Sequence, residues 1–117
     1  MKKITESLLK LKPDIVCLCG DRYEILAAAI SCTLLKIPIA HLHGGELTYG
    51  SIDEFFRHSI TKMSHLHFTS NIIYKRRVIQ LGENPKYVFN TGSTTLDYIS
   101  KIKFLKKKEL EEKYKFS

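Results

Sequence analysis

The 117-residue sequence lacks any apolar run long enough to cross a bilayer, and it has no low-complexity linker or internal repeat. A membrane-spanning helix needs about 20 predominantly apolar residues. The start, MKKITESLLKLKP, carries lysines but no apolar segment ahead of a small-residue cleavage site, so it does not have the pattern of a secretory signal. We therefore expect a cytoplasmic protein that does not engage a membrane.

Cysteine is scarce, and the CxxC pairs typical of metal or redox sites are absent. The three cysteines are Cys17, Cys19 and Cys32. Cys17 and Cys19 lie two apart in an apolar run, so on a strand they point to the same side and cannot easily bridge each other. The sequence therefore predicts free, buried thiols in a reducing compartment.

Standard cofactor motifs are also missing. The sequence has neither GxGxxG nor GxxxxGK[ST], the glycine-rich loops that cradle dinucleotides and nucleoside triphosphates. Two H-x-H pairs occur, His41 with His43 and His65 with His67, but no helical His-Glu pair or cysteine cluster completes a zinc set. We therefore expect no metal and no cofactor, and we interpret His41, His65 and His67 as structural.

The net charge of +7 at first indicates a nucleic-acid partner. A nucleic-acid footprint is a basic face with aromatic or loop elements near it. Most of the basic excess here lies instead in residues 1–20 and 101–117, where lysines on terminal helices solvate an exposed surface. We therefore expect no nucleic-acid binding.

Short apolar runs alternate with helical patterns along the chain. Apolar runs of this kind are typical of strands buried on both faces, and their alternation with helices predicts a parallel, three-layer α/β sheet with helices on both faces. The predicted strands are 14–20, 37–43, 65–70 and 86–90. The predicted helices are 4–11, 22–36, 52–63 and 71–82, with 94–114 helical but broken near 101–103.

Polar clusters follow three of these strands, and the carboxyl ends of parallel strands carry the ligand site in open α/β sheets. The carboxylates could act as general acid and base, and the arginines could orient them or bind phosphate. Two simpler interpretations stay open: Asp53 caps its helix, and Asp21 is a solvated loop residue. The clusters are Gly20-Asp21-Arg22, His43-Gly44-Gly45-Glu46 with Asp53, Glu54 and Arg57 behind it, and Asn90-Thr91-Gly92-Ser93.

Four ordered blocks resemble the UDP-N-acetylglucosamine 2-epimerases, and most closely the hydrolysing branch that makes N-acetylmannosamine for sialic acid. The blocks are GDRYE (20–24), PIAHLHGGELTYGSIDE (38–54), RHSITKMSHLHF (57–68) and RRVIQLGENP (76–85). The resemblance implies a GT-B architecture of two Rossmann-like domains. It implies that residues 1–95 are the later part of the first domain and that residues 96–117 cross toward a second domain.

The resemblance further implies that an opening strand and a whole second domain lie outside this sequence. On that basis we expect the chain alone to have little or no turnover, and we expect the complete protein to be a homo-oligomer like other family members. The implied substrate is UDP-N-acetylglucosamine, or UDP-GlcNAc, or a related nucleotide sugar.

The implied mechanism is an elimination, in which a carboxylate removes the C2 proton while UDP leaves from C1. Water then adds to the resulting 2-acetamidoglucal. Crowding of the acids should raise the pKa of at least one of them. The residues that match the family's catalytic positions are Asp21, Glu46 and Glu54, with Asp53 less certain, and those that match binding positions are Arg22, His43, Gly44, Gly45, Arg57 and Ser93.

Three alternatives stay open at this point. The first is a non-hydrolysing epimerase that returns UDP-N-acetylmannosamine, and the second is a related enzyme acting on bacillosamine-type nucleotide sugars. The third is a non-catalytic remnant that keeps the α/β module without the chemistry.

Overall fold

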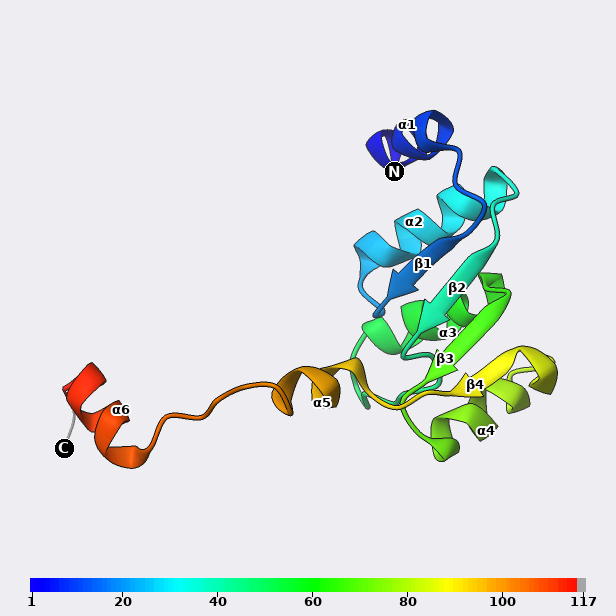
Figure 1. Cartoon of the computed structure of the whole chain (residues 1–117). Coiled ribbons are helices and arrows are strands. Elements are labelled where there is room, and N and C mark those ends of the chain that lie inside the picture. The colour runs from blue at the N-terminus through cyan, green and yellow to red at the C-terminus, as the bar shows by residue number, and fades with distance from the viewer. Residues whose placement is uncertain (116–117) are drawn as a thin grey trace.

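Residues 1–115 are described by the structure, a computed structural model, and they form a four-stranded sheet with helices and an extended C-terminal arm (Figure 1). The elements in chain order are α1 (Lys2–Leu11), β1 (Val16–Cys19), α2 (Tyr23–Leu34), β2 (Ile39–Leu42), α3 (Asp53–Met63), β3 (Leu66–Thr69), α4 (Ile72–Gln80), the 3₁₀ turn η1 (Pro85–Tyr87), β4 (Val88–Asn90), α5 (Thr94–Ile99) and α6 (Lys107–Tyr114).

Local sequence signals account for the element boundaries. The side chain of Asn71 caps α4 by accepting hydrogen bonds from the backbone N–H groups of Ile73 and Tyr74 at 2.9 and 3.0 Å. The helix predicted over 94–114 is interrupted between α5 and α6, a wider break than expected. The last two residues of the predicted crossing, 116 and 117, lie outside the described residues.

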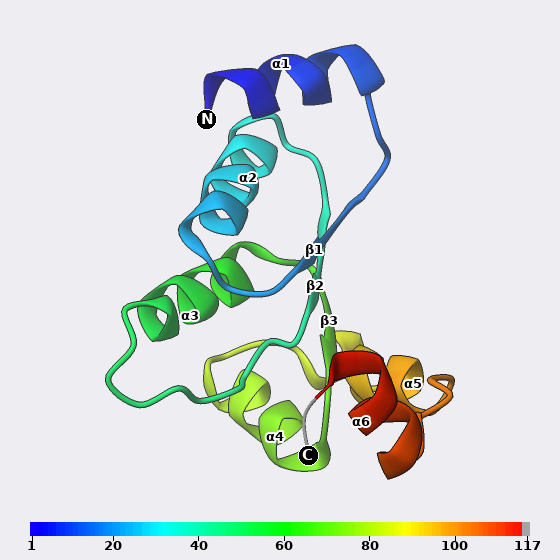
Figure 2. The ribbon, with the colours of Figure 1, turned by 90° about the vertical axis from the view of Figure 1, so that its left-hand side faces the viewer.

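The sheet is parallel, with strand order β1-β2-β3-β4, as the sequence predicts. Right-handed connections between strands that always advance in one direction place α2, α3 and α4 on the same face, and Figure 2 shows α2 and α3 on one side of the edge-on sheet. The prediction that helices cover both faces is therefore not met within residues 1–115, which supply the sheet and one helical layer.

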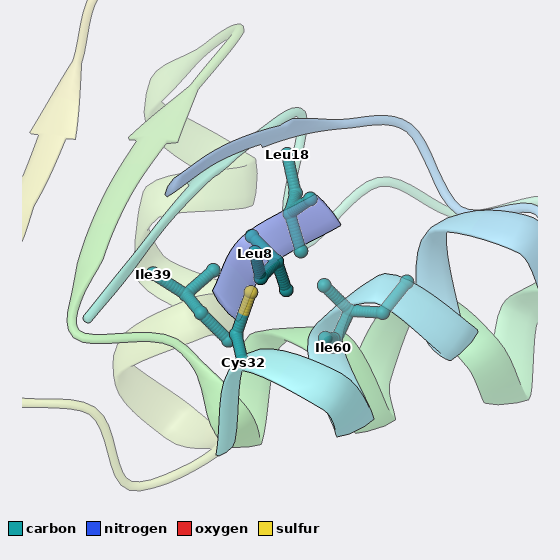
Figure 3. Packing of buried hydrophobic residues seen from close by; sticks show 6 residues of the cluster. Leu8, Leu18, Cys32, Ile39 and Ile60 are labelled. Atoms are coloured by element: carbon teal, nitrogen blue, oxygen red, sulfur yellow. The ribbon is translucent and has the colours of Figure 1, made fainter. Parts of the chain in front are cut away.

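The core lies between the sheet and this helical layer. Leu18 and Ile39 of β1 and β2 pack against Cys32 of α2 and Ile60 of α3, and Leu8 of α1 closes one end (Figure 3). Complete burial of an aliphatic side chain stabilises a fold by about 1.5–3 kcal/mol. This cluster therefore holds β1 and β2 in register, and with them the loops at their carboxyl ends.

The opposite face of the sheet is open. Cys17 and Cys19 are exposed there, which corrects the prediction of buried thiols, whereas Cys32 is buried as expected. Partial burial, together with the nearby groups of Cys17 and Glu46, raises the pKa of Cys19, so its thiol stays protonated at neutral pH. None of the helices in residues 1–115 is long and apolar enough to span a membrane.

Candidate active site

The predicted polar clusters converge at the carboxyl edge of the sheet. Asp21 follows β1, the loop from His43 leads from β2 into α3, and Thr94 follows β4. Hydrogen bonds link all three segments: Arg57 of α3 contacts Asp21, and His43 contacts Thr94. The parallel register alone explains this meeting, because every strand ends at the same edge.

Arg57 is the centre of the site. Its side chain is only 5% exposed, and its guanidinium donates to the carboxylate of Asp21 through Nη2 and to Glu54 Oε2 at 2.8 Å through Nη1. It also donates to Thr48 Oγ1 at 2.9 Å and to the backbone carbonyl of Glu46 at 2.6 Å. One buried cation therefore joins two carboxylates and the loop after β2, which is the geometry in which a guanidinium is most useful.

Glu54 is held as an anion by this arrangement. Its Oε2 also accepts a hydrogen bond from the backbone N–H of Thr48 at 2.7 Å, and its Oε1 lies 3.0 Å from His58 Nε2. Burial by itself would raise the pKa of Glu54, but the hydrogen bonds from Thr48 and His58 and the charge of Arg57 outweigh it, so the pKa is lowered. Glu54 is therefore not an acid whose pKa is raised by crowding.

Glu46 lies in a different environment. Its Oε1 accepts a hydrogen bond from Ser70 Oγ at 2.7 Å and lies 2.8 Å from His43 Nδ1. The other ring nitrogen of His43, Nε2, is 3.0 Å from Thr94 Oγ1. His43 has a positive φ of 66°, a conformation rare for residues other than glycine, which turns the chain at the end of β2.

Gly45 permits a close approach between this loop and α4. A Cβ at Gly45 would lie 2.5 Å from the carbonyl oxygen of Tyr74 and 2.9 Å from Val78 Cγ2, and its φ is +79°. Arg77 Nη1 donates to the carbonyl of Gly45 at 2.5 Å. Gly44 is less restricted, since its Cβ would meet His41 Nδ1 and Thr61 Oγ1 at 3.1 Å each. The two glycines thus seat the loop between α4 and the sheet.

His41 supports the site from below. It is fully buried, its Nε2 lies 3.1 Å from the carbonyl of Gly20, and its Nδ1 lies 3.2 Å from Thr61 Oγ1. Burial lowers the pKa of His41 to about 4, so the ring is neutral at pH 7 and Nε2–H donates to Gly20. This confirms the structural interpretation of His41 and ties the residue before Asp21 to α3.

Three of the predicted site residues stay outside this cluster. Asp53 is the first residue of α3, and its carboxylate accepts a hydrogen bond from Ser51 Oγ at 3.4 Å. Since α3 has Ile52 at its N-cap and no capping side chain, Asp53 does not cap the helix. Arg22 is exposed and pairs with Glu24 at 3.4 Å. Ser93 precedes α5 and makes no side-chain hydrogen bond within residues 1–115, whereas its neighbour Thr94 contacts His43.

Sequence reasoning missed three hydroxyl residues, Thr48, Ser70 and Thr94. Each donates or accepts within the site, yet none belongs to a charged motif. Their only signal was position, because Ser70 and Thr94 follow β3 and β4 at the same edge as the acids. A serine at the carboxyl end of a predicted strand could have been included on that ground alone.

An open hollow of about 400 Å³ lies beside the site, lined by Cys19, Gly20, Asp21, Arg22, Glu24 and Ile25. Another, of about 420 Å³, lies at the opposite edge near His67 and Glu83 and has no part in this cluster. Within residues 1–115, no group of three or more His, Cys, Asp or Glu side chains is arranged to hold a metal ion.

The family model of UDP-N-acetylglucosamine 2-epimerases matches residues 1–117. This chain belongs to that family. It is 58% identical over 102 residues to a GDP/UDP-N,N'-diacetylbacillosamine 2-epimerase (hydrolyzing) of Campylobacter jejuni, which covers 87% of this chain and 27% of that protein. It is 54% identical over 101 residues to the polysialic acid biosynthesis protein P7 of Escherichia coli, covering 86% and 26% respectively.

Solved structures of UDP-GlcNAc 2-epimerases also resemble this chain. The UDP-GlcNAc 2-epimerase of Methanocaldococcus jannaschii, solved in complex with UDP-GlcNAc and UDP, is 31% identical and superposes with a TM-score of 0.78, covering 82% of this chain and 27% of that protein. The predicted fold class is confirmed as a parallel, Rossmann-like α/β sheet that forms part of a GT-B architecture. The chain spans about a quarter of the length of the curated relatives it matches.

Proposed function

We propose that this chain supplies the proton-transfer side of the active site of a hydrolysing UDP-GlcNAc 2-epimerase. The reaction converts UDP-GlcNAc and water to N-acetylmannosamine and UDP. The observation that carries the proposal is the buried Arg57, which gathers Asp21, Glu54 and the loop of Glu46 at the carboxyl edge of the sheet. Family membership supplies the substrate class.

The chemistry needs two proton-handling groups. The C2 proton of the sugar passes to a carboxylate, the C1–O bond breaks, and UDP leaves with the bonding electrons, which creates a C1–C2 double bond. Water then adds its oxygen to C1 while a proton returns to C2 on the opposite face. A carboxylate with a fixed, accessible oxygen is suited to each proton transfer.

Hydrogen bonding divides the three acids into two roles. Both oxygens of Glu54 are occupied, by Arg57 and Thr48 on one and by His58 on the other. Asp21 Oδ1 and Glu46 Oε2 have no hydrogen-bond partner within residues 1–115, so each can meet a substrate. We therefore assign proton transfer to Asp21 and Glu46, and we assign Glu54 the positioning of Arg57.

The remaining site residues have binding roles in this proposal. Arg22, at the rim of the hollow beside Asp21, is placed to meet the leaving diphosphate. His43, Gly44 and Gly45 shape the sugar side, while Asp53 and Ser93 lie at its margin. Residues 1–95 form part of the first domain and 96–117 the crossing to a second domain, which fits the exposed apolar side chains of α5, such as Leu96 and Tyr98. We place the complete protein in the cytoplasm as a homo-oligomer.

A second substrate is favoured by one observation. The 58% identical relative of C. jejuni is named for N,N'-diacetylbacillosamine rather than for N-acetylglucosamine. The same elimination and hydration would convert that nucleotide sugar, because the sugars differ away from C1 and C2. The residues of the hollow near Asp21 would then set the preference.

Proton NMR in D₂O tests both substrates. The chain replaces the matching segment of the C. jejuni relative, and this chimera is incubated with UDP-GlcNAc or with UDP-N,N'-diacetylbacillosamine beside the parent enzyme and the 117-residue chain. We expect UDP release and a free 2-epimeric sugar that carries deuterium at C2. A nucleotide-linked epimer would indicate the non-hydrolysing reaction. A folded chimera that leaves both substrates intact beside an active parent would overturn the proposal and favour the remnant.

A further inference from the structure

Glu46 is anchored at both ends of the residue. Its backbone carbonyl accepts a hydrogen bond from Arg57 Nη1 at 2.6 Å. Its carboxylate receives two donors on the same oxygen, Oε1: Ser70 Oγ at 2.7 Å and His43 Nδ1 at 2.8 Å. The second oxygen, Oε2, carries no hydrogen bond from any residue of the described chain.

Two donors on one oxygen fix the orientation of a carboxylate. The terminal torsion of glutamate is broad and nearly two-fold, so a single donor would leave the group free to pivot. Ser70 follows β3 and His43 follows β2, and these neighbouring strands are held in register by Leu42 and Phe68. The two donors therefore approach Oε1 from separate, fixed positions, and the direction in which Oε2 points is fixed as a result.

The partners also determine the tautomer of His43. A carboxylate only accepts hydrogen bonds, so the nitrogen facing Glu46, Nδ1, carries the proton. In the neutral ring Nε2 is then an acceptor, and Thr94 Oγ1 at 3.0 Å donates to it. The resulting chain of groups, Thr94–His43–Glu46–Ser70, joins the ends of β2, β3 and β4.

We propose that Ser70 is a positioning residue of the active site, which holds Glu46 through Oε1 so that Oε2 faces the sugar for proton transfer. The inference rests on the function proposed above, and it adds a residue that neither the family motifs nor the charged cluster includes. Ser70 does not contact the reacting atoms in this arrangement. It acts on the rate through the orientation of Glu46, because small misplacements of a catalytic group strongly reduce turnover.

Kinetics of the chimera test this role. Ser70→Ala removes the donor, and we expect kcat to fall about tenfold or more with KM nearly unchanged, since orientation rather than binding is lost. Ser70→Thr keeps a hydroxyl and should retain most of the activity. Ser59→Ala is the matched control, because Ser59 Oγ donates only to the carbonyl of Phe55 on the exposed side of α3. Wild-type kcat in a folded Ser70→Ala variant would overturn the inference.

A structural measurement separates this inference from the proposed function. Crystal structures of the 117-residue chain with serine and with alanine at position 70 show the carboxylate directly. In Ser70→Ala we expect the Glu46 carboxylate to rotate away from the orientation that it has in the unmodified chain. In Ser70→Thr we expect the carboxylate to keep that orientation. If the unmodified chimera is inactive, the proposed function fails, yet these structures still decide whether Ser70 holds Glu46. An unmoved carboxylate in the alanine variant would refute the positioning role.

Discussion

The guanidinium of Arg57 donates a hydrogen bond to the carboxylate of Asp21, a residue 36 positions earlier in the chain. This contact joins the end of β1 to the first half of α3, across the intervening strand and loop. The same side chain reaches Glu54 one turn away. Arg57 therefore compensates two carboxylates whose side chains are only 25% and 20% exposed.

Removal of the Arg57 guanidinium should substantially lower the free energy of unfolding. Truncation of one member of a buried ion pair leaves the other charge uncompensated and costs about 3–5 kcal/mol. We expect Arg57→Ala to lower the free energy of unfolding of the 117-residue chain by about 3 kcal/mol, measured by urea denaturation. Arg22→Ala is the control, because its pair with Glu24 is exposed and surface pairs contribute at most about 1 kcal/mol. Equal losses in the two variants would contradict the central role of Arg57.

The lowered pKa of Glu54 predicts an acid-sensitive fold. A carboxyl group whose pKa is lower in the folded than in the unfolded state stabilises the fold above its unfolded value, and this stabilisation is lost as the pH falls through the folded value. We expect the free energy of unfolding to decline below about pH 4.5, the ordinary value for this group. Glu54→Gln should weaken that decline, whereas Glu24→Gln at an exposed site should leave it unchanged.

His41 predicts a second pH dependence at higher pH. Its pKa is about 4 in the folded chain against 6.5 ordinarily, so the unfolded chain binds the additional proton between these values. The contribution of neutral His41 to the free energy of unfolding is therefore fully present above pH 6.5 and decreases as the pH falls toward 4. At 1.36 kcal/mol per pH unit, the total decrease is about 3 kcal/mol. Ring resonances of His41 in NMR spectra should not titrate until about pH 4. Titration near pH 6.5 would show that the ring is not buried as described.

Gly45 and Gly50 form a matched pair for backbone packing. Both have positive φ, +79° and +77°, but a Cβ at Gly50 meets no atom within 4 Å. Gly50→Ala should therefore lower the free energy of unfolding by only about 1 kcal/mol, the cost of placing an alanine in the left-handed conformation. Gly45→Ala should lower the free energy of unfolding considerably more, since its Cβ would overlap the backbone of Tyr74 and force α4 or the loop to move. Urea denaturation of both variants gives the difference, and equal losses would argue against close packing of the loop on α4.

Sequence patterns were sufficient to locate the strands and helices, because these elements differ in length and periodicity. The four apolar runs and the helical patterns between them placed every strand and most helix ends close to their observed positions. Coverage of the sheet was not predictable in the same way. It depends on the order in which strands add to the sheet, and no local pattern around Cys17 or Cys19 encodes that order.

The sequence was enough to predict which acids lie together in the site, but not which role each acid has. Asp21, Glu46 and Glu54 follow strands that end at one edge, so their convergence follows from topology. The division between them depends on individual hydrogen bonds, such as those from Thr48 and His58 to Glu54. Uncharged donors give no sequence signal strong enough to separate them from ordinary loop residues.

The connection between His43 and Thr94 also bears on when the site forms during folding. These residues are 51 positions apart, and Glu46 and Ser70 are 24 apart. Closing long segments of chain costs conformational entropy before the contact contributes anything. We therefore expect the helices and the early strand pairs to form first, and the proton-transfer geometry to be completed in the last stage, when the end of β4 reaches the loop after β2.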